Sequence, residues 1–524
     1  MRKKQIVIAV ITASISCMAT VQLAPIFTDN AVFQQNAPIR IWGIADPQET
    51  VAISFAEQKK TVTANPQGRW LVTLDPMDAS CEPRTLICST SNGNHKSAIE
   101  NVLVGEVWLA GGQSNMAGTM KRFREHPQDI SEASDPLLHF VTVPRKDFEG
   151  DSSPTPQWQT AAPQSVQDFS GSAYYFAKNL RKALGDVPIG IIACAVGGTP
   201  AEAWISRRAF QNSPELAEQV LKPYEAYCRT EFPAEGDYEK YLEEFEAAKR
   251  EFARKKTAKE TPNPRPVWKM GPHNTKRPGG LHETMLAQAV PYTVRGAIWY
   301  QGENNAKTET SAHYRKVFPA LIENWRSAFQ NSDMPFLFVQ LPPLGPATSA
   351  SPGWPELRDA QLWADLNVPN TGMAVLLDGG DLKDIHPHSK GKVGTRLALL
   401  ARQMVYGETN LVTRGPQLKK ATRDNGFIEL TFSTFGSELM LKNEPVSGFQ
   451  ICGKDKNFIP ARAELIDGKI RISSPSVRKP QEVRYAWKQW IVPTLFNTDG
   501  LPASPFRTDD FPLRTEGNYY YNMQ

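Results

Sequence analysis

The chain has 524 residues, of which 40% are hydrophobic and 10% aromatic, a composition that excludes a disordered protein. At roughly 150 residues per domain, this length predicts about three domains. The formal net charge is only +4 and there is no long basic run, which argues against nucleic acid as a partner.

The first 20 residues have the pattern of a secretory signal peptide. Residues 2–4 are basic, residues 6–13 are apolar, and small and polar residues follow. This apolar run is shorter than the ~20 residues that a membrane span needs, and we expect no membrane span later in the chain. Cys17 leaves a lipid anchor as an alternative, although Ser14 stands where such anchors usually have a leucine-like residue. We therefore expect a secreted, periplasmic or cell-envelope protein.

Residues 24–103 are predicted to form an N-terminal β-sandwich domain. Short alternating runs are separated by turn signals such as Asp46-Pro47 and Asn65-Pro66, which is typical of small β-domains. Cys81 and Cys88 could pair across a hairpin there. The cysteines after the leader are otherwise odd in number and scattered, so we expect no disulfide scaffold, and none has metal-site spacing.

An apolar strand predicted from Val102 to Ala110 stops at Gly111 and Gly112, and Ser114 follows where the next helix would begin. Two glycines permit a tight turn, and the free amides of a helix start can donate to an anion. Such a position suits a nucleophilic serine. A lone serine there would more often be a helix cap, so the rest of the chain has to decide.

From about residue 104 to 407, predicted strands and helices alternate. A helix is expected over Gly171–Leu184 with Ser172 as its cap, and a strand over Ile189–Ala195. Thr199 and Glu202 have the spacing of a capping box. Further strands are expected at 297–300, 336–341 and 373–377. This alternation predicts a parallel sheet between two helix layers, with ligands bound beyond the carboxyl ends of the strands.

Two further regions complete the predicted organisation. Residues 207–281 are expected to form a helical insertion whose charged segment is a solvated surface, followed by an extended linker at 262–266. Residues 408–524 return to alternating runs and are predicted to be a second β-domain with a tail. We find no internal repeat at a fixed period.

Ester hydrolysis by a serine needs a base and a group that orients the base. His386 follows the last predicted strand, and Asp384 lies two residues earlier, on the same side of an extended backbone. We therefore predict Ser114, His386 and Asp384 as a catalytic triad. Asp381 remains the alternative orienting acid. The alternative histidines are His388 and, with no carboxylate beside them at a strand end, His126, His282 and His313.

The oxyanion of such a reaction needs preorganised hydrogen-bond donors. We predict the backbone amides of Ser114 and Gly198 and the side-chain amide of Gln301 as these donors. Asn304 is the other candidate amide donor. The alternative for both Gln301 and Glu303 is that they only brace the loop.

Four ordered blocks of this sequence resemble the sialate O-acetylesterases of the SGNH-hydrolase superfamily. They are residues 112–116 (Gly-Gln-Ser-Asn-Met), 197–204 (Gly-Gly-Thr-Pro-Ala-Glu-Ala-Trp), 299–305 (Trp-Tyr-Gln-Gly-Glu-Asn-Asn) and 384–387 (Asp-Ile-His-Pro). Residues 26–30 and 500–509 are similar to the flanking β-domains of that family. The resemblance implies a three-layer, flavodoxin-like SGNH core, with Ser114, Asp384 and His386 as the triad and Ser114, Gly198 and Gln301 as the oxyanion hole.

Two positions depart from the superfamily pattern. The triad acid usually stands three residues before the histidine, where this chain has Lys383, and the third block usually supplies Asn where this chain has Gln301. The first departure leaves open which acid orients His386. The second replaces one side-chain amide donor by another, so a donor for the oxyanion is still present at residue 301.

Taken together, the residues and the resemblance predict a secreted serine esterase that removes O-acetyl groups from sialic acids through an acetyl-enzyme. It would need no metal and no cofactor. Alternatives are an acetylxylan or other carbohydrate acetylesterase and, from another class, an inert carbohydrate-binding envelope protein. Arg122, Arg124 and Arg507 are candidate contacts for a sugar carboxylate. The sequence gives no oligomeric state.

Overall fold

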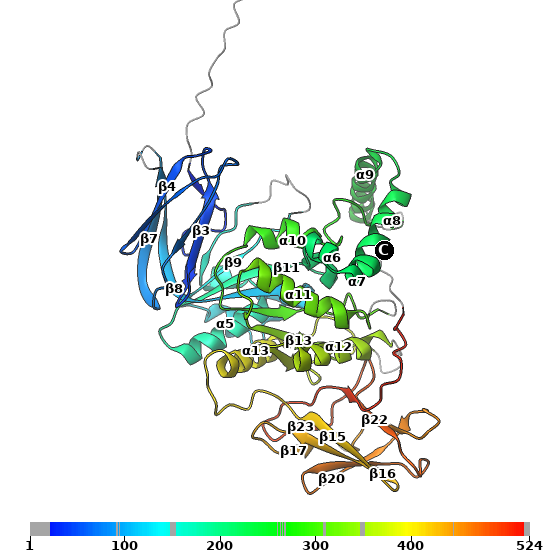
Figure 1. Ribbon diagram of the computed structural model, residues 1–524. Helices are drawn as coiled ribbons and strands as arrows, with labels where there is room; N and C mark the ends of the chain where they lie inside the picture. Colours follow the sequence, from blue (N-terminus) through cyan, green and yellow to red (C-terminus); the bar gives the residue numbers. More distant parts are fainter. Residues whose placement is uncertain are drawn as a thin grey trace, which may run out of the picture.

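The computed structural model describes residues 21–517, apart from 91–92, 94, 147–153, 259, 262–263, 265, 267–268, 308–310, 346–351 and 444. It is a mixed α/β fold with a large central sheet and further β-sheets near both ends of the chain (Figure 1). The expected signal peptide with Cys17, and much of the expected linker, lie outside the described residues. Among the helices that are described, none combines the length and the apolar character needed to cross a membrane.

The N-terminal region is built from short antiparallel strands, as the alternating pattern predicts. The alternation of buried and exposed residues in β3 and β6 places one face of each strand in the core. One sheet contains β1 (Gln22–Leu23), β3 (Ile39–Ile44) and β6 (Arg69–Leu74), and a second set contains β2 (Val32–Gln34), β4 (Thr50–Phe55), β5 (Gln58–Thr63) and β7 (Ser80–Thr90), joined to the first part of β8.

The suggested pairing of Cys81 with Cys88 does not form. Both cysteines lie on the single strand β7, and both are free thiols. Seven residues of extended chain separate them by roughly 20 Å, far beyond the reach of a disulfide. The reason is that β7 continues through the stretch where the sequence suggested a hairpin turn.

Strand β8 (Lys96–Gly112) links the N-terminal strands to the central sheet. Its first half pairs with β7, and its second half is buried and pairs in parallel with β11 and β12. The boundary predicted between residues 103 and 104 therefore falls inside one strand. Apart from Glu106, the second half of β8 is apolar, which fits a strand that is covered on both faces.

The central sheet has the order β10-β9-β11-β8-β12-β13-β14, and all neighbours except the β10–β9 pair are parallel. If β9 and β10, the two strands at one end of this order, are set aside, the remaining five strands follow the chain order 2-1-3-4-5. The strand order reverses at β8, so the crevice beyond its carboxyl end is where a ligand is expected. The bounds are β9 (Asp135–Thr142), β10 (Gln159–Ala161), β11 (Ile189–Ala195), β12 (Gly296–Tyr300), β13 (Phe336–Gln340) and β14 (Thr371–Val375).

Helices α5 (Gly171–Leu184) and α13 (Lys390–Met404) pack closely together, and α11 (Tyr314–Ala328) packs with α12 (Gly353–Asn367). The predicted span of α5 is confirmed, but its predicted cap is wrong. Ser170 Oγ accepts the N–H of Ala173, whereas Ser172 Oγ donates to the Asn115 carbonyl at 2.8 Å. Shorter helices are α1 (Ser114–Ala117), α2 (Met120–Phe123), α3 (Gln128–Ser131), α4 (Pro163–Val166), η1 (Ala201–Trp204), α10 (Gly280–Thr284) and η3 (Leu286–Gln288).

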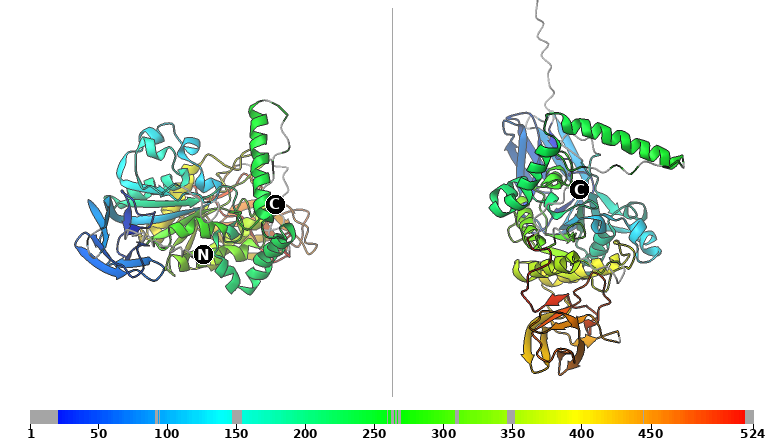
Figure 2. Two further views of the ribbon diagram at one scale, coloured as in Figure 1. Left: turned by 90° about the horizontal axis from the view of Figure 1, so that it is seen from above. Right: turned by 90° about the vertical axis from the view of Figure 1, so that its right-hand side faces the viewer.

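The predicted insertion is helical, and its longest helix α9 (Asp237–Thr257) extends away from the rest of the chain (Figure 2). Before α9 come α6 (Arg207–Asn212), α7 (Pro214–Leu216), η2 (Ala217–Leu221) and α8 (Lys222–Glu231). The C-terminal strands form three small sheets, from β15 (Gln417–Asp424), β16 (Phe427–Ser433), β17 (Leu439–Leu441), β18 (Phe449–Cys452), β19 (Ile459–Pro460), β20 (Arg462–Ile466), β21 (Lys469–Ser473), β22 (Glu482–Tyr485), β23 (Leu495–Asn497) and β24 (Phe506–Arg507).

Candidate active site

Ser114 lies at the carboxyl end of β8, as the first residue of α1. Gly112, two residues earlier, has φ +138°, and a Cβ at this position would lie 2.1 Å from the Tyr300 carbonyl oxygen of β12. Only glycine fits such a close approach of two strands. The turn then presents the Ser114 hydroxyl at the edge of the sheet.

The imidazole of His386 lies within hydrogen-bonding distance of both of its predicted partners. Its Nε2 is 2.9 Å from Ser114 Oγ, and its Nδ1 is 3.1 Å from Asp384 Oδ1. Asp384 Oδ1 also accepts the backbone N–H of His386 at 2.8 Å. The loop after β14 thus holds the acid and the imidazole together, and the fold brings this pair to a serine 272 residues away.

The electrostatics favour an ionised Asp384 and a neutral His386. Burial acts to raise the pKa of Asp384, but the hydrogen bonds from His386 and the charge of Arg122 lower it below its usual value. Burial and Arg122 lower the pKa of His386, and Asp384 only partly offsets this. An ionised Asp384 requires the proton of the neutral imidazole on Nδ1, which leaves Nε2 free to accept a proton from Ser114.

The alternative residues have other positions and partners. Asp381 Oδ1 accepts the backbone N–H groups of Lys383 and Asp384 at 2.7 and 3.0 Å, so it shapes the loop that carries the acid. The ring of His388 lies 5.7 Å from that of Phe123. The other histidines stand in separate elements: His126 precedes α3, His282 lies in α10 and His313 precedes α11.

The backbone amides of Ser114 and Gly198 lie close to the nucleophile. Gly198 has φ +67°, and a Cβ on its neighbour Gly197 would lie 3.4 Å from the Ser114 Cβ. In the described part of the chain, neither the Ser114 N–H nor the Gly198 N–H has an acceptor. Both amides are therefore available to an oxyanion.

The side chain of Gln301 is already used within the protein. Its Nε2 donates to the Thr199 carbonyl at 3.1 Å and to Asn305 Oδ1 at 2.7 Å, and its Oε1 accepts the Tyr314 hydroxyl at 2.9 Å. Both of its N–H bonds are thus occupied, and the expected side-chain donor is not available in this arrangement. Asn304 donates one N–H to the Gly198 carbonyl at 3.0 Å and keeps a second N–H beside that loop.

The capping box predicted for Thr199 and Glu202 does not form. Thr199 Oγ1 donates to the Val196 carbonyl. Asn305 Nδ2 donates to the buried Glu202 carboxyl, 3.2 Å from Oε1 and 2.9 Å from Oε2. Burial raises the pKa of Glu202. The bonds between Glu202 and Asn305 join the segment after Gly198 to the loop after β12. These two segments are distant in the sequence, so a local sequence pattern could not predict their contact.

Comparison with known proteins shows to which family the chain belongs. A family model described as "Carbohydrate esterase, sialic acid-specific acetylesterase" matches residues 104–230 and 274–404. A solved structure of a carbohydrate acetylesterase from Xanthomonas citri is 32% identical and has a TM-score of 0.76, covering 94% of this chain and 100% of its own. The chain belongs to the family of sialic acid-specific acetylesterases.

Curated relatives extend this similarity over most of the esterase. The sialate O-acetylesterase of Mus musculus is 28% identical and covers 92% of this chain and 93% of its own length. That of Homo sapiens is 26% identical, with coverages of 91% and 90%. Because the present chain belongs to the family named above, it is a carboxylic ester hydrolase.

Of the three arginines considered as sugar contacts, only Arg122 reaches the triad of the esterase. Its Nη2 donates to Asp384 Oδ2 at 3.2 Å and lies 3.4 Å from His386 Nδ1. Arg124 donates to the Lys121 carbonyl, and Arg507 lies in β24, where it pairs with Asp509. No local pattern marked Arg122 as a neighbour of the triad, because its partners lie 262 residues further along the chain.

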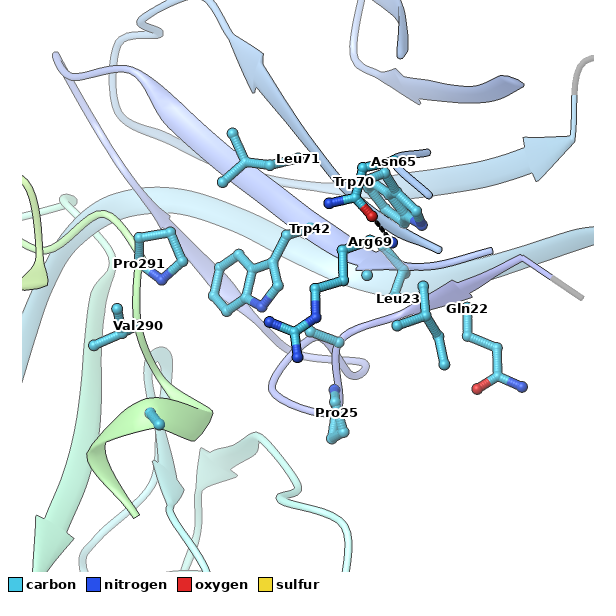
Figure 3. A pocket seen from close by; sticks show the side chains of 14 residues that line it. Gln22, Leu23, Pro25, Trp42, Asn65, Arg69, Trp70, Leu71, Val290 and Pro291 are labelled. Atoms are coloured by element: carbon cyan, nitrogen blue, oxygen red, sulfur yellow. Dashed lines mark hydrogen bonds between the residues drawn. The ribbon is translucent and has the colours of Figure 1, made fainter. Parts of the chain in front are cut away.

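A cavity of about 660 Å³ lies on another part of the esterase (Figure 3). Trp42 and Arg69 line it from the N-terminal sheet, and Val290 and Pro291 line it from the segment before β12. The segment before β12 is at the amino end of the parallel strands, whereas Ser114 is at their carboxyl end. The cavity is therefore separate from the triad. Within the described ranges, no group of His, Cys, Asp and Glu side chains is arranged to hold a metal ion.

Proposed function

We propose that this esterase removes acetyl groups from the hydroxyls of O-acetylated sialic acids, with Ser114, His386 and Asp384 as its triad. The observation that carries the proposal is the 2.9 Å separation of Ser114 Oγ and His386 Nε2 at the carboxyl edge of the sheet. The names of the mouse and human relatives support sialic acid as the acceptor. The Xanthomonas relative supports a second candidate, the acetyl ester of another carbohydrate.

In the first half of the reaction, Ser114 Oγ attacks the acetyl carbonyl carbon and His386 Nε2 takes the hydroxyl proton. The carbonyl oxygen becomes an oxyanion, which accepts hydrogen bonds from the backbone N–H groups of Ser114 and Gly198. We assign the third donor to the side chain of Asn304, because both N–H groups of the Gln301 side chain are occupied. The intermediate then collapses. The C–O bond to the sugar breaks, and His386 returns its proton to the departing sugar oxygen.

In the second half, His386 accepts a proton from a water molecule that attacks the acetyl-enzyme. The new tetrahedral intermediate collapses, the bond to Ser114 Oγ breaks, and the proton on Nε2 passes back to Oγ. The product is acetic acid, which loses its proton to solvent as acetate. Asp384 keeps the imidazole in one tautomer and stabilises the imidazolium that forms in each half, without itself taking a proton.

The proposal extends to the type of core and to the location of the protein. We assign the central region to the three-layer SGNH type, which is supported by the 2-1-3-4-5 order and by the position of Ser114 after β8. Export from the cytoplasm is supported by the basic and then apolar character of residues 1–20. Amino-terminal sequencing of the protein recovered from its native host, together with cell fractionation, tests export.

Acetate release from 9-O-acetyl sialic acid and from acetylated xylan tests the activity. We expect wild type to release acetate faster from the sialic acid, and Ser114→Ala to release none from either. Ser131→Ala is the control, because this serine is exposed on α3 and its hydroxyl donates to the nearby Gln128 carbonyl. Faster release from xylan would transfer the proposal to the second candidate. An unchanged rate in Ser114→Ala would refute the nucleophile, and no release by wild type would favour an inert binding protein.

A further inference from the structure

Three buried polar side chains meet where the elements of the candidate site converge. Asn115 follows Ser114 in α1, Glu303 lies in the loop after β12, and Lys390 is the first residue of α13, just after the His386 loop. Asn115 and Lys390 are fully buried, and Glu303 is 7% exposed. The mechanism described above uses none of them.

The three side chains form one continuous set of hydrogen bonds. Asn115 Oδ1 accepts from Lys390 Nζ at 2.5 Å, and Asn115 Nδ2 donates to Glu303 Oε1. The amide of Asn115 is therefore oriented from both sides, by an ammonium and by a carboxyl group. Replacing either neighbour would leave part of this amide without a partner.

The same set holds the backbone on both sides of His386. Asn115 Nδ2 donates to the carbonyl of Ile385 at 3.0 Å, and Lys390 Nζ donates to the carbonyl of Pro387 at 2.8 Å. These are the residues immediately before and after the histidine. Because Asn115 is covalently joined to Ser114, these bonds tie the nucleophile and the base to the same side chain.

The placement of charge here is costly for folding. A lysine with no exposed surface loses its hydration, and burial lowers the pKa of Lys390 to about 7. The negative charge of Glu303, on the other side of the Asn115 amide, acts to raise the pKa of Lys390, and so do the charges of Asp384 and Glu125. The positive charge of Arg122 lowers this pKa further. The rings of Phe123 and Tyr300 lie 4.6 and 5.4 Å from Nζ.

Stability alone does not account for these three polar side chains, because well-packed apolar residues commonly stabilise a core as much as a buried ion pair does. Directional bonds to two defined carbonyls do something that apolar residues cannot, since they fix a loop in one position. The bonds of Asn115 and Lys390 end on the carbonyl groups of the two residues that flank the general base.

We propose that Lys390, Asn115 and Glu303 form a positioning network that holds His386 at hydrogen-bonding distance from Ser114. The inference rests on the proposed roles of Ser114 and His386. Within the part of the chain that the structure describes, none of the three side chains bonds to the imidazole or to the nucleophile oxygen, so they act through the backbone. A misplacement of reacting groups by about 1 Å is enough to cost ~10²-fold in rate, which sets the scale of the expected effect.

Lys390→Met tests the network, since it keeps the length of the side chain and removes its donors. We expect kcat on p-nitrophenyl acetate to fall by roughly 10- to 100-fold while KM changes by less than about twofold, because the network does not touch the substrate. Lys390 also lowers the pKa of His386, so the acid limb of the kcat/KM profile should move to higher pH. Lys392→Met is the matched control, because this lysine lies in the same helix, is exposed and pairs with Asp378.

Two substitutions of Glu303 provide a second test that does not require Lys390→Met to fold. Glu303→Gln keeps an acceptor for Asn115, whereas Glu303→Met has a similar length and no such acceptor. We expect the glutamine variant to have at least several-fold higher kcat than the methionine variant, with the same KM. Equal kcat in these two variants, or wild-type kcat in a folded Lys390→Met, would overturn the network. Activity remaining in Ser114→Ala would instead overturn the proposed function.

Discussion

Arg122 offers a direct test of the electrostatics at the triad. Its guanidinium lies 3.4 Å from His386 Nδ1 and bonds to Asp384 Oδ2, and its positive charge is among the causes that lower the pKa of His386. Arg122→Met removes the charge and keeps an unbranched side chain over the ring of Phe123, where the guanidinium now lies 4.8 Å from the centroid. We expect the pKa of His386 to rise in this variant.

The size of the shift follows from exposure and distance. The Arg122 side chain is 52% exposed, so the interaction is screened by solvent. Two unit charges about 4 Å apart in a water-like medium interact by ~1 kcal/mol. At 1.36 kcal/mol per pKa unit, this corresponds to a rise of ~0.7 unit.

The sign of the effect on activity is fixed by the role of the base. His386 must be neutral to accept the proton of Ser114, so kcat/KM falls as the pH drops through the pKa of the free enzyme. In Arg122→Met this acid limb should lie at higher pH, giving lower activity than wild type in mildly acidic buffer and equal activity on the alkaline side. High salt should reduce the difference.

The assay is the pH dependence of kcat/KM for p-nitrophenyl acetate, a small neutral ester that separates this effect from any contact with an acidic sugar. Arg124→Met is the control, because Arg124 lies two residues away and donates to the Lys121 carbonyl. An acid limb that stays in place, or moves to lower pH, in Arg122→Met would refute the reasoning.

Three further changes have distinct expected outcomes. Asp384→Asn should lose roughly 10-fold in kcat/KM, because the His386 backbone N–H directs the amide oxygen to the imidazole, while the charge and the hydrogen bond from Arg122 are lost. Asp384→Ala should lose ~10³-fold or more. Asn304→Ala should lose ~10²-fold in kcat with little change in KM, as for an oxyanion donor. Gly394→Ala should lower the free energy of unfolding by ~1–3 kcal/mol in urea titrations, because its Cβ would lie 2.4 Å from the Phe176 backbone nitrogen.

Each of these predictions has its own contrary result. Equal losses in the two Asp384 variants would show that geometry is not retained by asparagine. Wild-type kcat in Asn304→Ala would remove it from the oxyanion hole, provided that its melting temperature is unchanged. Gly379→Ala is the control for Gly394, because its Cβ would meet nothing nearer than 3.5 Å; similar unfolding free energies for the two variants would contradict the close packing of α5 and α13.

Local patterns were sufficient for the elements that carry the site. The strand Ile189–Ala195 and the helix Gly171–Leu184 have the predicted bounds, because continuous apolar runs and helical spacing are properties of neighbouring residues. Predictions about side-chain partners were less successful. Ser172 was expected to cap α5, and Thr199 was expected to form a capping box, but each bonds to a backbone carbonyl outside the predicted motif. Those choices depend on which groups tertiary packing brings near.

By itself, the sequence determined where strands end in glycines and polar residues, and therefore that Ser114 and the Asp384–His386 pair stand after strands. Only the tertiary structure decided that Gln301 is occupied, that Arg122 bonds to the acid, and that Lys390 bonds to Asn115. The physical reason is the range of the interactions. Strand and turn preferences act over a few residues, whereas a hydrogen bond between segments separated by a hundred residues or more exists only after the parallel sheet has aligned the ends of its strands.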